Sequence, residues 1–201
     1  MAAFKEDLTN EFSFPISFDV AFNELLIEDV EKVKALKGSH PFFNANNFTI
    51  PDRIQRLVSF IGLNIDPLKS FLFKLDPFDM GPIHLDGDPN LNKLRKCGMN
   101  FSWGNHETHM QWFDKKMPTA THTYAGIVLP YFDPATTKML FTKALRGGNL
   151  VNVEYPHRVR SLSPNLRISL SIGFKEDIAW ADLKRLFQVN ADSIQNTFAT
   201  N

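Results

Sequence analysis

The sequence predicts a mainly β protein with flanking helices, of the α+β class, on the basis of three observations. Strand signals recur from residue 70 onward. The gaps between them are short and rich in Gly, Pro, Asn and Asp, which favours an antiparallel sandwich or barrel over alternating strand and helix units. Helical periodicity is concentrated near the two ends of the chain. These features predict a β core with helices supporting it.

Helices are expected in the N-terminal region. Asn23 is a candidate N-cap for a helix whose apolar stripe ends near Gly38. A second helix is expected to begin at Pro51, because proline suits the first helical turn, and to end before Gly62.

The remaining elements follow from period-two alternation and from turn residues. Pro15 places the first strand at a sheet edge. After Asp133, a short helix is predicted over 135–145, and a last helix over 179–189 carries one apolar stripe. The expected strands are 11–18, 71–75, 82–85, 97–103, 108–113, 123–129, 150–155 and 167–174.

The length of 201 residues fits one domain, 1–201, with a core of ordinary size. Within it we expect an N-terminal helical and edge-strand support region (1–65), a β core (70–175) and a C-terminal helix (178–201). A hydrophobic share of 43% with 19 Phe is that of a packed globular chain, which argues against disorder.

Composition excludes several classes of function. Lys plus Arg equals Asp plus Glu at 22 each, so no global field favours nucleic acid over a small molecule or a peptide as partner. The single cysteine, Cys97, excludes an internal disulfide framework, fits a reducing compartment and is expected to be buried. The N-terminus becomes charged before any long apolar run, and no stretch approaches a membrane span. We therefore expect a cytoplasmic protein with no membrane partner.

Three side chains have the spacing of a metal site. His84 and Asp86 are two residues apart, so on an extended strand both point to the same face. His157 could complete a set of two imidazoles and one carboxylate, which leaves open positions on a non-haem Fe(II). Taken alone, a His-x-Asp pair is a weak signal, and the distal histidine strengthens it.

An anion site is predicted on the strand that follows. Arg167 and Ser169 share a face of this strand, so a guanidinium and a hydroxyl could hold one carboxylate. Arg158 and Arg160 are rivals because they flank His157. Both lie at odd spacing from His157 and should face outward, unless a bulge intervenes.

Four phrases in this order resemble the motifs of the 2-oxoglutarate and Fe(II)-dependent oxygenases. The resemblance covers about half the chain, and its order and spacing are more specific than any single phrase. It implies a double-stranded β-helix, that is, a cupin-like jelly-roll core. The phrases are Ile83-His84-Leu85-Asp86-Gly87, Met99-Asn100-Phe101-Ser102-Trp103, Pro156-His157-Arg158-Val159 and Leu166-Arg167-Ile168-Ser169-Leu170-Ser171.

The resemblance also implies the cofactors and the reaction. His84, Asp86 and His157 would be the catalytic Fe(II) ligands, and Arg167 with Ser169 would bind the far carboxylate of the cosubstrate 2-oxoglutarate. Dioxygen would take the remaining position. By similarity, the chain would be a dioxygenase, and a hydroxylase in particular, that yields succinate and carbon dioxide.

Asn100 stands out as an amide in an apolar strand. An unsatisfied buried amide costs on the order of 1 to 3 kcal/mol, so it needs a partner. The resemblance places it in the cofactor-binding cavity, and a bond to neighbouring backbone is an equally good interpretation.

Other residues remain open from sequence. His106 fits a solvated turn, whereas His109 or His122 could contact substrate. Trp103 and Trp112 could line the substrate entrance but are more typical of core.

Two other functions stay open. One is a cupin-type metalloprotein that does not use 2-oxoglutarate, which leaves Arg167 and Ser169 without a ligand. The other is a non-catalytic jelly-roll binding protein, whose mark would be a missing ligand, and none is missing here. Nothing in the sequence specifies the prime substrate or the oligomeric state.

Overall fold

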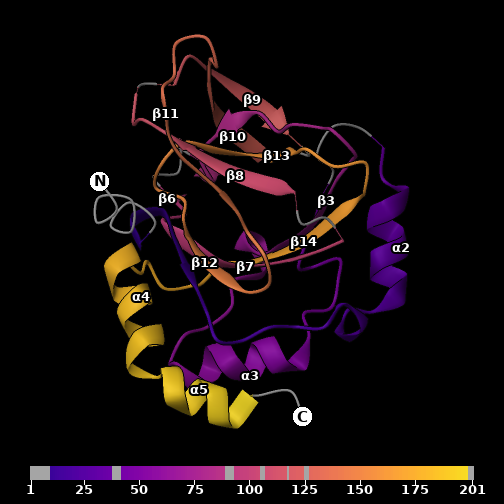
Figure 1. Ribbon diagram of the computed structural model, residues 1–201, viewed down its shortest axis with the longest axis vertical. Coiled ribbons are helices and arrows are strands. Elements are labelled where there is room, and N and C mark those ends of the chain that lie inside the picture. The colour runs from indigo at the N-terminus through magenta and orange to yellow at the C-terminus, as the bar shows by residue number, and fades with distance from the viewer. Residues whose placement is uncertain are drawn as a thin grey trace.

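Two antiparallel six-stranded sheets face each other in the computed structural model, which describes residues 10–37, 42–88, 93–104, 107–116, 118–124 and 127–198. Figure 1 shows the sheet that we call the minor sheet above the one that we call the major sheet. The face that each sheet turns toward the other is its inner face.

The major sheet has the order β1-β12-β7-β14-β3-β2. Its strands are β1 (Ser13–Pro15), β12 (Asn149–Asn152), β7 (Cys97–Trp103), β14 (Arg167–Ile172), β3 (Phe71–Leu75) and β2 (Phe42–Asn44).

The minor sheet has the order β11-β8-β13-β4-β10-β9. Its strands are β11 (Met139–Ala144), β8 (Thr108–Phe113), β13 (His157–Ser161), β4 (Ile83–His84), β10 (Ile127–Phe132) and β9 (Ala120–Tyr124). A separate two-stranded sheet pairs β5 (Gly87–Asp88) with β6 (Lys93–Leu94).

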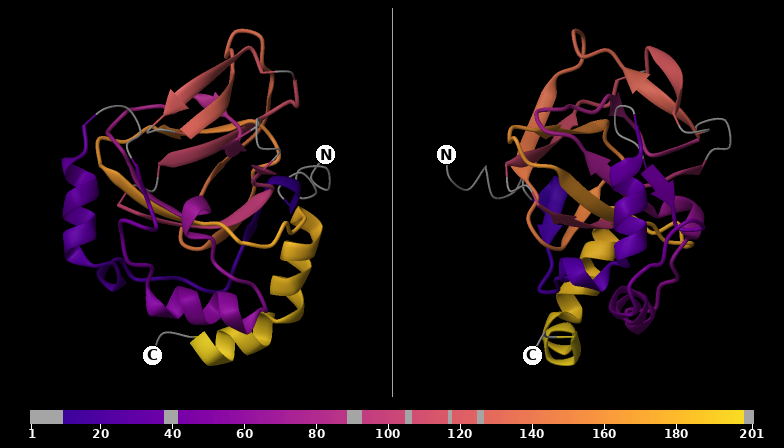
Figure 2. Two further views of the ribbon diagram at one scale, coloured as in Figure 1. Left: turned by 180° about the vertical axis from the view of Figure 1, so that it is seen from behind. Right: turned by 90° about the vertical axis from the view of Figure 1, so that its right-hand side faces the viewer.

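Helices support the major sheet from outside. Helices α3 (Asp52–Phe60) and α5 (Ala191–Phe198) lie beneath it, as both views of Figure 2 show. Helices α2 (Ile27–Ala35) and α4 (Trp180–Val189) stand at its ends in Figure 1. The largest apolar cluster joins these helices to the outer face of the major sheet, through Ile54, Leu57, Leu183, Ile194, Leu72, Met99, Phe101, Ile168, Leu170 and Ile172, among others.

Strand β14 shows how alternation divides the two faces of the major sheet. All six of its residues are buried, although they alternate between polar and apolar side chains. Ile168, Leu170 and Ile172 pack into the helix-side cluster. Because successive side chains on a strand point to opposite faces, Arg167, Ser169 and Ser171 lie on the inner face. A buried polar surface therefore faces the minor sheet.

An apolar cluster closes one side of the space between the sheets. Phe12 packs against Trp112, Phe141 and Tyr155 with ring centroids 5.0 to 5.7 Å apart. Met110, Leu145, Val151 and Val153 complete this cluster. The polar side chains are thereby confined to the other side, around β4, β13 and β14.

Most predicted elements are present. Strands β3, β7 and β8 have the predicted bounds, and α3 and α4 begin within a residue of the expected positions. Strand β1 is shorter than predicted but lies at the edge of its sheet, as Pro15 requires. The fold class predicted from sequence is confirmed.

The helix predicted over 135–145 is wrong. Asp133 starts only one turn, with its carboxylate accepting from Ala135 N and its carbonyl accepting from the Thr136 and Thr137 amides. The chain then extends as β11 and pairs with β8. Threonines disfavour continuation of a helix, and β8 offers unpaired backbone groups that a strand can satisfy.

Two other predicted elements need correction. The single strand predicted over 123–129 is a hairpin of β9 and β10, and β10 continues through Pro130 to pair with β4. Asn23 does not cap α2, which begins at Ile27; it lies instead in a separate 3-10 turn, Phe22–Glu24. Glu24 fixes this turn, because it accepts from Ala21 N at 2.9 Å and pairs with the guanidinium of Arg53 at 2.7 Å.

None of the helices in the described ranges has the length and apolar composition needed to cross a bilayer.

A matched pair of glycines tests the close packing at the end of β7. Gly104 has φ +92°, and a Cβ there would lie 2.5 Å from the Leu166 carbonyl oxygen, whereas Gly62 has φ +78° with open space around it. We expect Gly62→Ala to lower the free energy of unfolding by about 1 kcal/mol from backbone strain alone. Gly104→Ala should lower it further in urea titrations, because a backbone carbonyl must also move. Equal losses would show that the contact with Leu166 is unimportant.

Candidate metal centre

Three predicted ligands meet on the inner face of the minor sheet. Strands β4 and β13 are neighbours, and His84 pairs directly with His157, with ring centroids 4.6 Å apart. Asp86 follows β4, and its Oδ1 lies 3.3 Å from His84 Nε2 and 3.4 Å from His157 Nε2. One ligand atom from each residue fits within 4.8 Å of the others, so the group could hold a single metal ion.

Both imidazoles are oriented by the same local contact. His84 Nδ1 lies 3.0 Å from the Pro82 carbonyl oxygen, and His157 Nδ1 lies 3.0 Å from the Tyr155 carbonyl oxygen. A carbonyl can only accept, so each Nδ1 carries the proton and each Nε2 is directed at Asp86. Metal-binding histidines are usually held in this way.

The electrostatics of the cluster favour an ionised carboxylate. Burial raises the pKa of Asp86, but the neighbouring His157, His84 and Arg95 outweigh burial and hold that pKa well below its usual range. Burial lowers the pKa of His84, but the hydrogen bond to Asp86 and the charge of Asp86 together raise that pKa by more. The net shift is upward. The group thus presents a fixed anion to a cation.

Arg167 occupies the opposing wall. It is 2% exposed, and its Nη2 donates to Ser102 Oγ at 2.6 Å. Its Nε and Nη1 are buried and have no hydrogen-bond partner within the described part of the chain. Burial lowers the pKa of Arg167 to about 9. Two unused donors on a buried cation call for an anionic acceptor.

Two hydroxyl groups lie beside this cation, and an amide lies further along the same inner face. Ser169 Oγ lies 3.1 Å from Ser102 Oγ, and both side chains occupy paired inner-face positions. Asn100 is buried, and its Oδ1 accepts from Ser171 Oγ at 2.6 Å. The Asn100 amide therefore has a side-chain partner rather than the backbone partner that we considered.

The two rival arginines lie on the other face of the minor sheet. Arg158 pairs with Gln111 in register and donates from Nε to its Oε1 at 2.7 Å, while His157 pairs with Trp112 of the apolar cluster. Arg160 is exposed and follows the same parity as Arg158. Arg167 is the one of the three that faces the interior.

Of the other histidines, only His109 has a described side chain, and it lies apart from the cluster. His109 pairs with Arg160 and so shares the outer face of the minor sheet. His122 pairs with Leu129 through its backbone, and its side chain lies outside the described set. His106 and His40 also lie outside the described residues.

The tryptophans and the cysteine belong to the core. Trp112 is fully buried and donates to the Asn152 carbonyl, and Trp103 packs on the helix-side cluster. Cys97 is buried, and burial raises the pKa of its thiol to about 12, so it is no nucleophile at neutral pH.

Sequence reasoning missed four polar residues of this interior. Ser102 and Ser171 continue the even spacing that begins at Asn100 and Arg167, so parity could have found them. Thr108 pairs with Ser161 on the inner face of β8, and its buried hydroxyl has no partner in the described ranges. Arg95 touches Asp86 at 3.4 Å, and no sequence spacing indicated this contact.

Comparisons with known proteins establish the fold. No protein-family model and no curated protein matches the sequence. Among solved structures, Escherichia coli ycfD matches with a TM-score of 0.51 and 14% identity, over 97% of this chain and 57% of that one. The fold is a cupin-like β-sandwich.

Two more solved structures illustrate the range of similar proteins. A Pseudomonas putida prolyl-4-hydroxylase matches with a TM-score of 0.44 and 13% identity, over 86% of this chain and 97% of that one. Lactobacillus farciminis oxalate decarboxylase matches with a TM-score of 0.39 and 10% identity, over 75% of this chain. The chain spans a third of the length of that decarboxylase, and 57% of ycfD.

Removal of one ligand should abolish tight metal binding. We expect His84→Ala to weaken Co(II) binding by more than the roughly 10- to 100-fold typical of losing a ligand's hydrogen-bond partner. His109→Ala is the matched control, because that imidazole lies on the opposite face of the same sheet. Calorimetric titration measures both, and equal affinities for the two variants would contradict the site.

Protons should compete with the metal near neutral pH. Because the pKa of His84 is raised above its ordinary value, its Nε2 is protonated at a higher pH than that of a free histidine. Apparent Co(II) affinity should therefore fall as the pH is lowered from about 8 to about 6, because a proton on His84 Nε2 competes with the metal ion. A pH-independent affinity over this range would exclude imidazole ligation.

Proposed function

We propose that this chain is an Fe(II)- and 2-oxoglutarate-dependent dioxygenase that hydroxylates an unidentified substrate. This proposal rests on two features of the facing sheets. The minor sheet carries a cluster of two histidines and one carboxylate, and the major sheet carries a buried guanidinium with unused donors. Such a cluster leaves coordination positions open on iron. The guanidinium supplies donors for a carboxylate.

The residues fit both cofactors. His84, Asp86 and His157 would hold Fe(II) through two nitrogens and one oxygen, with both Nδ1 protons already engaged. Arg167 would bind the far carboxylate of 2-oxoglutarate through Nε and Nη1, the two donors without partners in the described residues. Ser169 and Ser102 would add hydroxyl donors beside it.

The overall reaction balances without further reactants. Bound iron supplies the redox chemistry by which 2-oxoglutarate, dioxygen and a C–H bond give succinate, carbon dioxide and a C–OH bond. The chain's own residues would orient the reactants, and the side chains of His157, Arg167 and Ser169 are buried from water. With a net charge of zero, a small molecule or a peptide suits this chain better than nucleic acid as the substrate.

An anaerobic titration tests this proposal. The protein loaded with Fe(II) should develop the charge-transfer absorption of the metal–keto-acid chelate when 2-oxoglutarate is added, and should release succinate once air is admitted. Metal binding without this band would favour the cupin-type metalloprotein that does not use 2-oxoglutarate. Failure to bind metal would leave only a non-catalytic binding protein.

Arg167→Ala should weaken 2-oxoglutarate binding far more than it weakens metal binding. Loss of charge-assisted hydrogen bonds of about 1.5 to 3 kcal/mol corresponds to a roughly 10- to 200-fold rise in the dissociation constant. Arg158→Ala is the matched control, because it removes the same charge from the opposite face of the neighbouring sheet. The charge-transfer band reports 2-oxoglutarate binding, and Co(II) titration reports metal binding. Equal losses of both affinities in Arg167→Ala would indicate misfolding rather than loss of an anion site.

A further inference from the structure

A second buried arginine, Arg95, contacts Asp86 at the carboxylate oxygen that the two histidines do not approach. Arg95 is 6% exposed, and its Nη1 lies 3.4 Å from Asp86 Oδ2. The two histidine Nε2 atoms approach the other oxygen, Oδ1. The two carboxylate oxygens therefore have different partners: Oδ1 faces the metal-binding side, and Oδ2 faces Arg95.

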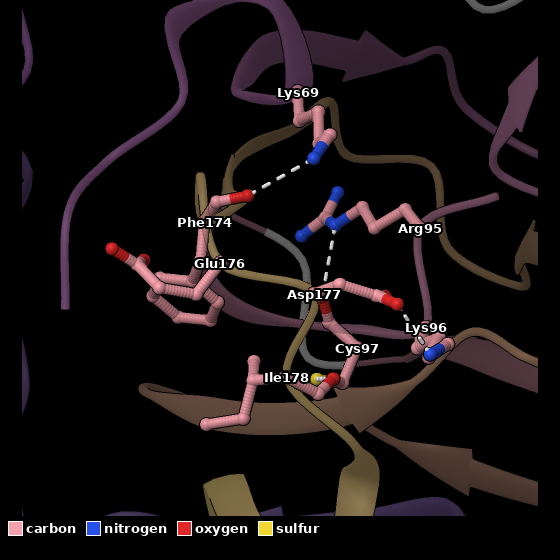
Figure 3. A pocket seen from close by; sticks show the side chains of 8 residues that line it. All are labelled: Lys69, Arg95, Lys96, Cys97, Phe174, Glu176, Asp177 and Ile178. Carbon is pink, nitrogen blue, oxygen red and sulfur yellow. Dashed lines mark hydrogen bonds and ion pairs between the residues drawn. The ribbon is translucent and has the colours of Figure 1, made fainter. Parts of the chain in front are cut away.

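The guanidinium is fixed by the major sheet rather than by Asp86 alone. Arg95 Nη1 donates to Ser171 Oγ at 2.9 Å, Nη2 to the Ile172 carbonyl at 2.7 Å, and Nε to the Cys97 carbonyl at 3.1 Å. Figure 3 shows the side chain extended between Lys69 and Cys97, with the bond to Cys97 drawn. All three nitrogens are thus used, in contrast to those of Arg167.

The backbone ties the same two residues together. The Arg95 amide donates to the Asp86 carbonyl at 2.9 Å, which closes the hairpin formed by β5 and β6. Asp86 is consequently held at its backbone and at one carboxylate oxygen by a single residue. Arg95 in turn donates to Ser171 and Ile172 of β14, so it links the end of β4 in the minor sheet to the major sheet.

Gly98 leaves the space that this arrangement needs. A Cβ at Gly98 would lie 1.6 Å from Arg95 Nη2 and 2.5 Å from its Cζ. Gly98 has no positive φ, so backbone conformation does not demand glycine there. Glycine is needed at position 98 because any Cβ there would overlap the Arg95 guanidinium.

We propose that Arg95 is a positioning residue of the metal centre, which holds Asp86 as a ligand through Oδ1 alone. This rests on the metal-binding part of the proposed function. A carboxylate freed at Oδ2 can turn and bind a metal through both oxygens, which would occupy a position needed by 2-oxoglutarate or dioxygen. Arg95 keeps that position open and reduces the motion of the ligand before the metal arrives.

The charge of Arg95 and its positioning of Asp86 should affect metal affinity in opposite directions, so variants of Arg95 can distinguish the two effects. A buried cation near the site repels a divalent ion, and removing it would tighten metal binding if charge were its main effect. Loss of a positioning partner typically weakens metal binding by about 10- to 100-fold. We expect Arg95→Gln to show the weakening, because the donors are directed by four separate contacts.

Co(II) alone is the probe, so the test does not depend on 2-oxoglutarate. Arg95→Gln should bind Co(II) about 10- to 100-fold more weakly and change the shape of its d–d absorption, which reports the coordination number and geometry of the ion. Arg95→Lys should not restore wild-type binding, because an ammonium cannot reproduce the planar fork. Lys96→Gln is the control, since that neighbouring cation pairs with Asp177 at the surface.

Ser171→Ala guards against a folding defect, because it removes one hydroxyl that holds Arg95 and leaves the charge in place. It should weaken Co(II) binding in the same direction by a smaller factor, and it should still unfold in one cooperative transition in urea, at a somewhat lower midpoint because Asn100 Oδ1 also loses its donor. Wild-type affinity and spectrum in Arg95→Gln, tighter binding in that variant, or full rescue by Arg95→Lys would each overturn the inference. Absence of Co(II) binding by the wild-type protein would instead overturn the proposed function.

Discussion

Two guanidinium groups are buried between the sheets, and their surroundings differ in one respect. Arg95 directs its three nitrogens at a carboxylate, a hydroxyl and two carbonyls. Arg167 has one hydroxyl acceptor, and two of its nitrogens have none among the described residues. A buried cation without acceptors is costly, and the proposed anion site at Arg167 rests on this observation. The proposed chemistry depends on this difference, because an anion would supply the acceptors that Arg167 lacks among the described residues.

The polar interior exists because the apolar core lies elsewhere. Helices α3, α4 and α5 cover the outer face of the major sheet and bury its alternate apolar residues. The cluster around Phe12 and Trp112 closes one side of the sandwich. These two regions supply the hydrophobic burial that holds the domain together. The inner face of β14 is therefore free to carry an arginine and two serines without being needed as apolar core.

Contacts run continuously across this interior. Asp86 touches both imidazoles on one side and Arg95 on the other. Arg95 contacts Ser171, which in turn donates to Asn100. The proposed metal ligands of the minor sheet are thereby joined to the middle of the major sheet. Arg167 and Ser169 occupy further inner-face positions on the same strand as Ser171, so β14 carries both the proposed anion-binding residues and a residue that holds Arg95.

Local spacing predicted much of this arrangement, and it failed where pairing decided the outcome. The two-residue step from His84 to Asp86, and the odd step from His157 to Arg158, fixed which side chains share a face. The segment 135–145 was misassigned because its conformation depends on the exposed edge of β8 rather than on its own periodicity.

The contacts of Arg95 with Asp86 could not be read from the sequence either, because the hairpin of β5 and β6 brings the two residues together.

The sequence by itself determined the residue types, the alternation that sends polar side chains to one face of β14, and the order of the motifs. Only the tertiary structure decided that β13 lies beside β4, so that His157 meets His84. It also decided that Ser171 supports an arginine 76 positions earlier in the chain. The physical reason is that alternation acts over neighbouring residues, whereas strand order depends on burying both sheets and the helices that cover them at once.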